Sequence, residues 1–405
     1  MRKMPVLIFL LLSNWFFAFT LQSFGDNPAL LAYDRRSVIS TGVDLDGALL
    51  QNFFSVQDWN NYLDGLPILI DDMKLEVLKG EDLVLAPKVS ATGFFNLSLL
   101  GLRITLNGGI RGAVKMNLPY EMMETLLKGV DIGYYNFEGS IQGIVWDEAG
   151  FGMSGKSGKI SWGVNLAMYA ILADLRNSDL KISYNSQFEP TTIKATTTVH
   201  TEIYSSYDLK QMMDSGDFDL FETENTGFKM DLGFVYGEEY PVFGIALKNL
   251  TLVPAKVEYV LQQDESTGFE VDLSDLANTE PSSTQVSTES FERIDPEDLS
   301  LPMAVEAFFF KRLGILSFGF RGSYDTRDVW NIGMSTGLSF DILPMSFEYT
   351  YHSNGCYEKT FTIGLDLHLL ACIVKLSWIS KEPWDTDPVV TPFAPRLDVI
   401  AIMGI

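Results

Sequence analysis

The sequence predicts an all-β protein, and within that class a transmembrane antiparallel β-barrel of about 14 strands. Three observations lead to this fold. From about residue 83 to the C-terminus, apolar residues recur at every second position and so share one face of each strand. Many segments run 10 to 14 residues, and about 9–11 residues cross a bilayer at a tilt. Their other faces are rich in Gly and Ser with scattered charges, which suits a wet or plugged lumen better than a dry core.

The alternation has a competing interpretation, because the strands of a soluble β-sandwich alternate as well. The composition excludes other classes. Of 405 residues, 53 are acidic and 29 basic, whereas a protein that binds nucleic-acid phosphates carries the opposite charge. Two cysteines give no disulfide framework, and three histidines leave little for zinc or general-base chemistry. We therefore expect no nucleic-acid partner, no metal and no cofactor.

The first element, residues 1–20, has the pattern of a signal peptide. Arg2 and Lys3 form a basic start, and the apolar core that follows is too short for a lasting membrane span. Ala18 and Thr20 are small enough to lie three and one residues before a cleavage site. An uncleaved anchor helix is the alternative. The later sequence has no long apolar run, so we expect export without a transmembrane helix.

The N-terminal region, residues 21–82, differs from the rest and contains the first strand. Residues 21–35 have no strong period. Two possible short helices lie around Trp59–Leu63 and Ile68–Leu78. A further helix is predicted over Tyr120–Lys128, because a proline precedes it and a glycine follows it.

Residues 150–157, with the sequence GFGMSGKS, match the phosphate-loop pattern. A nucleotide-binding loop of this kind needs a strand before it and a helix after it. Here the residues from Ile160 to Met168 alternate as a strand. We therefore interpret the motif as a Gly-rich hairpin and expect no bound nucleotide.

The most regular alternation lies in the second half of the chain, in residues 228–236, 316–324, 330–341 and 361–369. The polar faces of these segments supply the candidate lumen residues. These candidates are Lys229, Asp231, Arg321, Asp366 and His368. The final segment, 396–405, is expected to close against the first strand, because a barrel in lipid leaves no edge unpaired.

The order of the strands predicts which connections lie outside. Long loops are expected outside and short turns inside. If the C-terminus lies inside, the longest external loop is the acidic, Ser- and Thr-rich segment 263–301. The acidic helical piece Tyr207–Asp214 then falls on the inner side, a conflict that a missed strand would resolve. Aromatic residues near strand ends suit interfacial girdles. They are Tyr324, Trp330, Tyr349, Tyr351 and Trp378.

No catalytic or metal-binding arrangement emerges from the sequence. His352 ends a strand and His368 lies beside Asp366, without the Ser–His or Asp–His set that a barrel hydrolase needs. The acidic run 264–298 lacks the spacing of a calcium loop. We therefore expect that the protein is not an enzyme.

Four short stretches resemble the FadL-type outer-membrane transporters of hydrophobic compounds and the uncharacterised members of that superfamily. The first is an Asn27–Pro28–Ala29 box shortly after the signal peptide. The others are residues 118–129, 227–251 and 301–320. Residues 51–82 have no counterpart in the transporter pattern, and the number of strands counted along the chain runs from 14 to about 18.

The resemblance implies a 14-stranded barrel, residues 83–405, with the N-terminal region folded into its lumen as a hatch. Hydrophobic ligands would enter from the outer loops and leave sideways near a strand kink. By position, Asn27, Pro28 and Ala29 match the hatch box. We hypothesise that the charged lumen candidates tie the hatch to the wall.

The expected function is that of an exported bacterial outer-membrane barrel, surrounded by membrane lipid. It would pass small hydrophobic, fatty-acid-like molecules through a plugged lumen. The alternative is a non-transport surface barrel, an antigen, adhesin or secretion scaffold, that presents the acidic segment 263–301.

Overall fold

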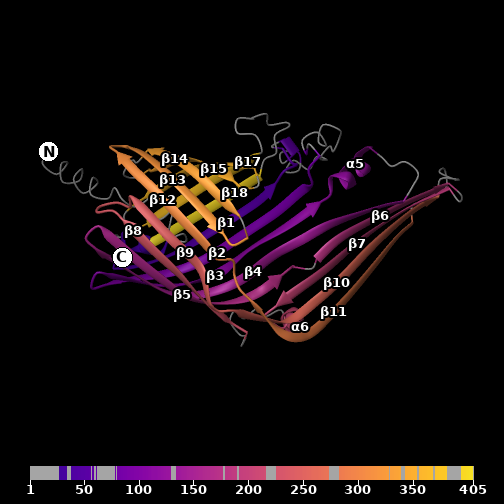
Figure 1. Cartoon of the computed structure of the whole chain (residues 1–405), viewed down its shortest axis with the longest axis horizontal. Helices are drawn as coiled ribbons and strands as arrows, with labels where there is room; N and C mark the ends of the chain where they lie inside the picture. The colour runs from indigo at the N-terminus through magenta and orange to yellow at the C-terminus, as the bar shows by residue number, and fades with distance from the viewer. Residues whose placement is uncertain are drawn as a thin grey trace.

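The computed structural model contains one large antiparallel β-sheet and a few short helices (Figure 1). The structure describes residues 27–33, 38–55, 57, 58, 61, 78, 80–128, 134–176, 178–188, 191–215, 225–272, 282–327, 329–338, 343–353, 355–367, 370–380 and 394–404. The predicted signal peptide lies outside the described residues, as do most residues of the two helices predicted between 59 and 78.

The helices are η1 (Pro28–Tyr33), α5 (Tyr120–Lys128) and α6 (Leu209–Ser215). The first nine strands are β1 (Ile39–Gln51), β2 (Leu83–Leu99), β3 (Leu102–Leu118), β4 (Tyr134–Ser157), β5 (Ile160–Asp174), β6 (Ser178–Phe188), β7 (Thr191–Ser205), β8 (Gly227–Tyr236) and β9 (Phe243–Val253). The remaining strands are β10 (Ala255–Asp272), β11 (Ser282–Leu299), β12 (Ala304–Leu313), β13 (Leu316–Asp325), β14 (Trp330–Leu338), β15 (Met345–His352), β16 (Tyr357–Asp366), β17 (Leu370–Ser380) and β18 (Ala394–Gly404).

Most strands form a closed ring. The chain runs through β1, β2, β3, β4 and β5, then β8 and β9, then β12 to β18, each strand pairing with the next in this series. β18 pairs with β1, from Ser40 opposite Gly404 to Ala48 opposite Arg396, and so closes the ring. The predicted closure of the last strand against the first is confirmed.

Four strands lie outside the ring and form what we term the side sheet. The first part of β4, Tyr134–Ile141, pairs with β6, and the ladder continues from β6 to β7, β10 and β11. In Figure 1 these strands extend to the right, beyond the ring. The sheet has 18 strands in all, so 14 remain in the ring. The predicted fold class, an antiparallel barrel with few short helices, is confirmed.

The side sheet corrects one expectation and explains another. Within the segment 263–301, predicted as a long loop, the described residues instead form the end of β10, up to Asp272, and all of β11, Ser282–Leu299. Ser, Thr, Gln and Glu on both strand faces hide the alternation that would mark a strand. The hairpin β6–β7 lies between β5 and β8 without joining the ring, so α6 lies at the same end of the ring as the end of β5. This resolves the predicted conflict around Tyr207–Asp214.

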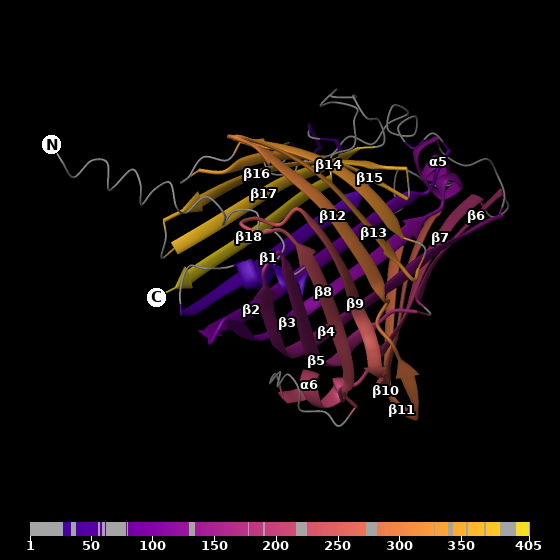
Figure 2. The same ribbon diagram turned by 60° about the vertical axis from the view of Figure 1, so that its left-hand side comes forward.

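The two ends of the ring differ in their connections. At one end, where the C-terminus lies, tight turns contain Gly101, Gly158 and Gly314 with φ of 82°, 60° and 65°, a backbone conformation that glycine adopts without strain. We term this the turn end. The opposite end, which we term the loop end, holds α5, α6 and the side sheet (Figure 2).

The outer face of the ring is apolar, as in barrels that span a membrane. Every ring strand exposes at least one large apolar side chain, among them Leu45, Phe95, Leu106, Phe151, Trp162, Phe234, Ile245, Phe309, Phe320, Met334, Phe347, Phe361, Leu376 and Leu397. Aromatic side chains gather where β14 to β16 approach the loop end, with ring contacts between Trp330 and Tyr351 and between Tyr351 and Tyr357. No helix among the described residues has both the length and the apolar character to span a membrane.

The inner face contains small apolar clusters at the turn end. Phe94 packs there with Ala371, Ile373, Ile400 and Ile402 from β17 and β18. A second cluster joins Val235 to residues of η1. Two further apolar clusters lie at the loop end, one joining Phe53 and Leu83 to α5 and one around Tyr169, so apolar packing occurs at both ends of the ring.

Candidate functional site: the lumen and its N-terminal segment

The segment Asn27–Tyr33 lies buried against the inner face of the ring. The side-chain amide of Asn27 donates hydrogen bonds to the carbonyl oxygens of Phe234 and Ile245, at 3.4 and 3.1 Å. Its side-chain oxygen accepts from the Ala29 amide at 2.9 Å, which begins η1. Asn27 thus shapes the segment and holds it to β8 and β9.

Two wall glycines make room for this segment. Gly163 of β5 and Gly233 of β8 lie directly opposite each other in the ladder. A Cβ at Gly163 would lie 2.3 Å from the Pro28 carbonyl carbon, and a Cβ at Gly233 would lie 2.1 Å from the Asn27 side-chain oxygen. No larger residue fits at either position while the segment is in place. The sequence Asn27–Pro28–Ala29 and these two glycines therefore form one packed unit.

Tyr33 anchors the other end of η1 at the turn end. Its hydroxyl donates to the carbonyl oxygen of Gly237 at 2.7 Å, and the Lys156 ammonium lies 3.9 Å from the centre of its ring. Lys156 also donates to the Glu238 carbonyl oxygen. The lysine of the phosphate-loop-like motif therefore contacts Tyr33 and the Glu238 backbone at the turn end. Residues 150–157 end β4 and turn directly into β5, without the helix that a nucleotide site needs.

A buried charge network lies on the inner wall. The Glu148 carboxylate accepts from Lys229 Nζ at 2.6 Å and lies 3.0 Å from Arg111 Nε. Trp146 Nε1 donates to the same carboxylate at 3.1 Å. Lys229 also donates to Asn249 Oδ1 at 2.9 Å. Since Glu148 and Lys229 are almost fully buried, their mutual pairing offsets a large desolvation cost.

Asp231 stabilises an irregularity in the wall. One of its oxygens accepts from the backbone amide of Asn249, at 2.8 Å, and the other from the Asn165 side chain, at 3.1 Å. The β8–β9 register shifts between Met230 and Leu232, and Asn249 has a φ of 54°. An Asp carboxylate that caps a free amide is a common way to hold such a bulge.

A cavity of about 130 Å³ lies between η1 and the wall strands β12 to β17. Its apolar lining includes Leu30, Phe308, Phe310, Leu338, Met345 and Ile373. Its charged lining includes Glu306, Arg321, Glu348 and Lys375. An apolar cavity of about 150 Å³ is known to hold one benzene molecule, so this cavity, with its mixed apolar and charged lining, has room for about one molecule of that size.

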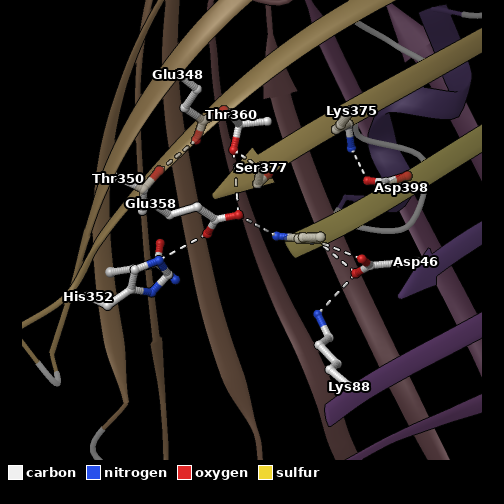
Figure 3. A network of polar contacts seen from close by, with 12 residues as sticks. Asp46, Lys88, Glu348, Thr350, His352, Glu358, Thr360, Lys375, Ser377 and Asp398 are labelled. Carbon is white, nitrogen blue, oxygen red and sulfur yellow. Dashed lines mark hydrogen bonds and ion pairs between the residues drawn. The ribbon is translucent and has the colours of Figure 1, made fainter. Parts of the chain in front are cut away.

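A second polar network covers the inner wall nearer the loop end (Figure 3). Arg396 grips Asp46 through two hydrogen bonds of 2.9 Å each and donates to Glu358 at 3.1 Å. Glu358 also contacts His352 Nε2 at 3.0 Å, and Lys88 contacts Asp46 at 3.3 Å. The network crosses β15, β16, β18, β1 and β2, and so ties together the strands on both sides of the closure.

The predicted lumen residues have different positions in the structure. Lys229 and Asp231 face the lumen, but the partners described above belong to the wall and not to η1. Arg321 lies 3.6 Å from Glu348, also on the wall. Asp366 belongs to β16, its side chain being outside the described part, and His368 lies outside the described residues. The expected charge pairs between hatch and wall are therefore replaced, for Lys229 and Asp231, by pairs within the wall.

The sequence pattern did not single out Gly163, Gly233, Glu148 or Phe308. The two glycines can be recognised as a pair only once the register of β5 against β8 is known. Neither Cys356 nor Cys372 takes part in a disulfide bond, in agreement with the absence of a disulfide framework expected from the sequence. No group of three or more His, Cys, Asp or Glu residues that could hold a metal occurs among the described residues.

Solved structures similar to this chain include two toluene transporters. The Pseudomonas putida transporter TodX is 9% identical, with a TM-score of 0.46, and the match covers 94% of this chain and 91% of TodX. The Ralstonia pickettii transporter TbuX is 9% identical, with a TM-score of 0.44, and the match covers 95% of this chain and 93% of TbuX.

A search of curated proteins gives no match to the chain. A family model does match it, over residues 37–276, which is more than half of its 405 residues. The matched part begins just before β1 and continues beyond the end of β10, so it includes both ring and side-sheet strands. The chain therefore belongs to the family of unknown function DUF5723.

Proposed function

We propose that this protein lets small hydrophobic, fatty-acid-like molecules cross the bacterial outer membrane through its lumen, with the segment Asn27–Tyr33 as the hatch. The observation that carries the proposal is the seat of this segment on Gly163 and Gly233, next to a cavity lined by Phe308 and Phe310. A wall that leaves room for a plug, beside a partly apolar cavity with room for one small molecule, suits gated passage better than a solid scaffold.

The outer membrane is the location that the apolar outer face supports, because a closed barrel leaves no backbone edge in lipid. Export by the predicted signal peptide, residues 1–20, belongs to the same proposal. The polar loop end suits the external side and the tight turns suit the internal side, following the usual asymmetry of these barrels.

The experiment is an uptake measurement in a bacterial host whose outer membrane excludes hydrophobic probes. Cells that express the full chain are exposed to 1-N-phenylnaphthylamine, and the rise in its fluorescence reports entry. Gly163→Val should raise uptake severalfold, because the new side chain collides with the backbone of Pro28 and displaces the hatch. Gly233→Val should act in the same direction.

The matched control is Gly47→Val, because a Cβ at Gly47 would meet no atom within 4 Å. Its uptake should equal that of the unchanged protein. Heat-modifiable migration on gels verifies that each variant still forms a barrel. If folded Gly163→Val and Gly233→Val variants take up the probe at the rate of the Gly47→Val control, the hatch does not gate passage.

The alternative, a surface scaffold, is favoured by the acidic hairpin β10–β11, which stands outside the ring. One deletion distinguishes a scaffold from a transporter. Replacement of residues 259–293 by a two-residue Asn-Gly turn should remove a scaffold function and leave probe uptake unchanged.

A further inference from the structure

The side sheet ends in a strand with one open edge. Within the described part of the chain, β11 pairs with β10 along Ser282–Leu299 and has no strand on its other side. Residues 284–290 are exposed one after another, so neither face of this stretch is covered. An open edge of this length presents a row of backbone amides and carbonyls that a further strand can pair with.

The edge stands in water and not in lipid. The side sheet leaves the ring at the loop end, where it extends away from the apolar outer face (Figure 2). Among the described side chains of β6, β7, β10 and β11, Val286 alone is large, apolar and exposed. By contrast, every ring strand exposes at least one large apolar side chain. A lipid-facing strand would need an apolar face, so the partner of this edge arrives from solution.

Charge selects the kind of partner. β10 and β11 each contain five acidic residues and one basic residue, a net charge of −4 per strand. The strands β6 and β7 each contain one acidic residue and one Lys. The negative charge is thus concentrated on the open side. A second copy of β11 would bring like charges together, which is unfavourable across a strand pair.

A groove beside the edge fits the same chemistry. It measures about 270 Å³ and is lined by Tyr204, Val260, Ile294 and Pro296 together with the carboxylates of Glu292 and Glu297. The β10–β11 register shifts here, between Val257 and Tyr259, and such bulges re-aim side chains. The chain's own Arg176 already lies on this lining, 2.8 Å from Glu297 and 4.4 Å from the centre of the Tyr204 ring, so the groove accommodates the apolar stem and charged end of a basic side chain.

We propose that β11 is a docking edge for an extended basic segment of another protein, which adds to the side sheet as a further strand. The backbone ladder provides the binding, and the acidic side chains of β11 select a basic partner. This inference is independent of transport through the lumen.

The test uses the full chain in detergent micelles and a fluorescent ten-residue peptide of alternating Lys and Thr. Fluorescence anisotropy should show binding that weakens as salt is added, because exposed charges are screened. Two control peptides isolate the two parts of the proposal. One has Glu in place of Lys, and the other keeps Lys but carries N-methyl groups on alternate backbone amides, which blocks strand pairing. Neither should bind.

The variants use the same measurement. Glu289→Gln combined with Glu292→Gln should weaken binding of the Lys–Thr peptide by about tenfold, because opposite charges across a strand pair stabilise it. The matched control, Glu121→Gln with Glu124→Gln on α5, should bind as the unchanged protein does. A disulfide between Ser287→Cys and a cysteine-bearing peptide should place the peptide at the edge.

Three results would overturn the proposal. The N-methylated peptide binding as well as the parent would show attraction by charge without strand addition. Equal binding by the β11 variant and the α5 control would place the peptide elsewhere. A dimer in solution that is joined through β11, detected by cross-linking Ser287→Cys to its own copy, would assign the edge to a second copy of the chain.

Discussion

The ring and the side sheet are built from the same antiparallel strands, yet their side chains meet different surroundings. In the ring, one face carries large exposed apolar residues and the other carries buried polar pairs such as Glu148–Lys229. The side sheet packs apolar residues such as Val257 near the ring, but further out residues 284–290 of β11 are exposed on both faces, and the ion pair Lys181–Asp179 of β6 is largely exposed. β4 belongs to both, since Tyr134–Ile141 pairs with β6 and the following residues pair with β5.

This comparison teaches that backbone pairing alone does not decide which part of a sheet is suited to a membrane. The polarity of the exposed side chains, which changes along the sheet, decides it. The apolar outside of the ring suits lipid. The stretch 284–290 of β11 is exposed residue after residue and has no such face, which suits water. The following experiments either sharpen this division or break it.

The largest expected difference concerns buried and exposed charge. Lys229→Met should lower the free energy of unfolding by about 3–5 kcal/mol, because it leaves Glu148 buried with one cationic partner fewer. Lys181→Met, on the solvent-exposed ion pair Lys181–Asp179 of β6, should cause a far smaller loss, because exposed ion pairs contribute little to stability. Urea unfolding in lipid vesicles, followed by tryptophan fluorescence, measures both. Equal losses would mean that the side sheet is as buried as the lumen wall.

The next difference concerns the outer surface. Phe320 and Val286 are 55% and 58% exposed, on the ring and the side sheet respectively. Phe320→Arg should cost about 2–4 kcal/mol in vesicles, the expected cost of a cation near the bilayer midplane. Val286→Arg should change stability by about 0.5 kcal/mol or less, as at an ordinary water-exposed site. A large loss with Val286→Arg would place the side sheet in lipid.

A third experiment removes the acidic hairpin. Replacement of residues 259–293 by a two-residue turn keeps Ala255 and Val257, which pack with Tyr169 at the base of the side sheet. The ring should still close, because none of its pairings uses the removed residues. Unheated and boiled samples should still migrate differently on a denaturing gel. Identical migration would show that the ring depends on the hairpin.

The smallest effect is a pH dependence within the side sheet. The hydrogen bond with Asp264, 2.7 Å long, raises the pKa of His200 above its ordinary value. A raised pKa in the folded state stabilises the β7–β10 pairing fully below the pKa of an unfolded histidine, about 6.5. That stabilisation is lost as the pH rises through the folded value.

Hydrogen exchange of the β7 and β10 amides, corrected for its intrinsic pH dependence, should therefore become faster relative to the ring between acidic and alkaline conditions. His200→Gln, which cannot titrate, should remove this change. A variant that keeps the full pH dependence would assign it to other groups.

The ring was predictable because each of its strands has one apolar and one polar face. The strands around Phe228–Tyr236 and Leu316–Tyr324, and the closing strand, lie where the alternation places them. The helix Tyr120–Lys128 follows from its proline start and glycine end. β11 was missed because its polar composition is typical of a loop, and only pairing with β10 reveals it as a strand.

The lumen was predictable in part. The box Asn27–Pro28–Ala29 was found through resemblance, whereas its seat depends on two glycines that meet only through the register of β5 and β8. Lys229 was identified as a lumen residue from its strand face, but its partner Glu148 lies on β4, two strands away in the ladder. Which charged side chains pair across several strands depends on the registers of the folded ring and cannot be read from the sequence of one strand.

The two excursions from the ring, β6–β7 and β10–β11, are each a complete out-and-back path. Each returns the chain to the end of the ring from which it left, so the direction of every later ring strand is unaffected. The side sheet of such a protein can therefore gain or lose whole hairpins. The number of ring strands, their alternating direction and the end of the ring at which the last strand stops would all stay the same.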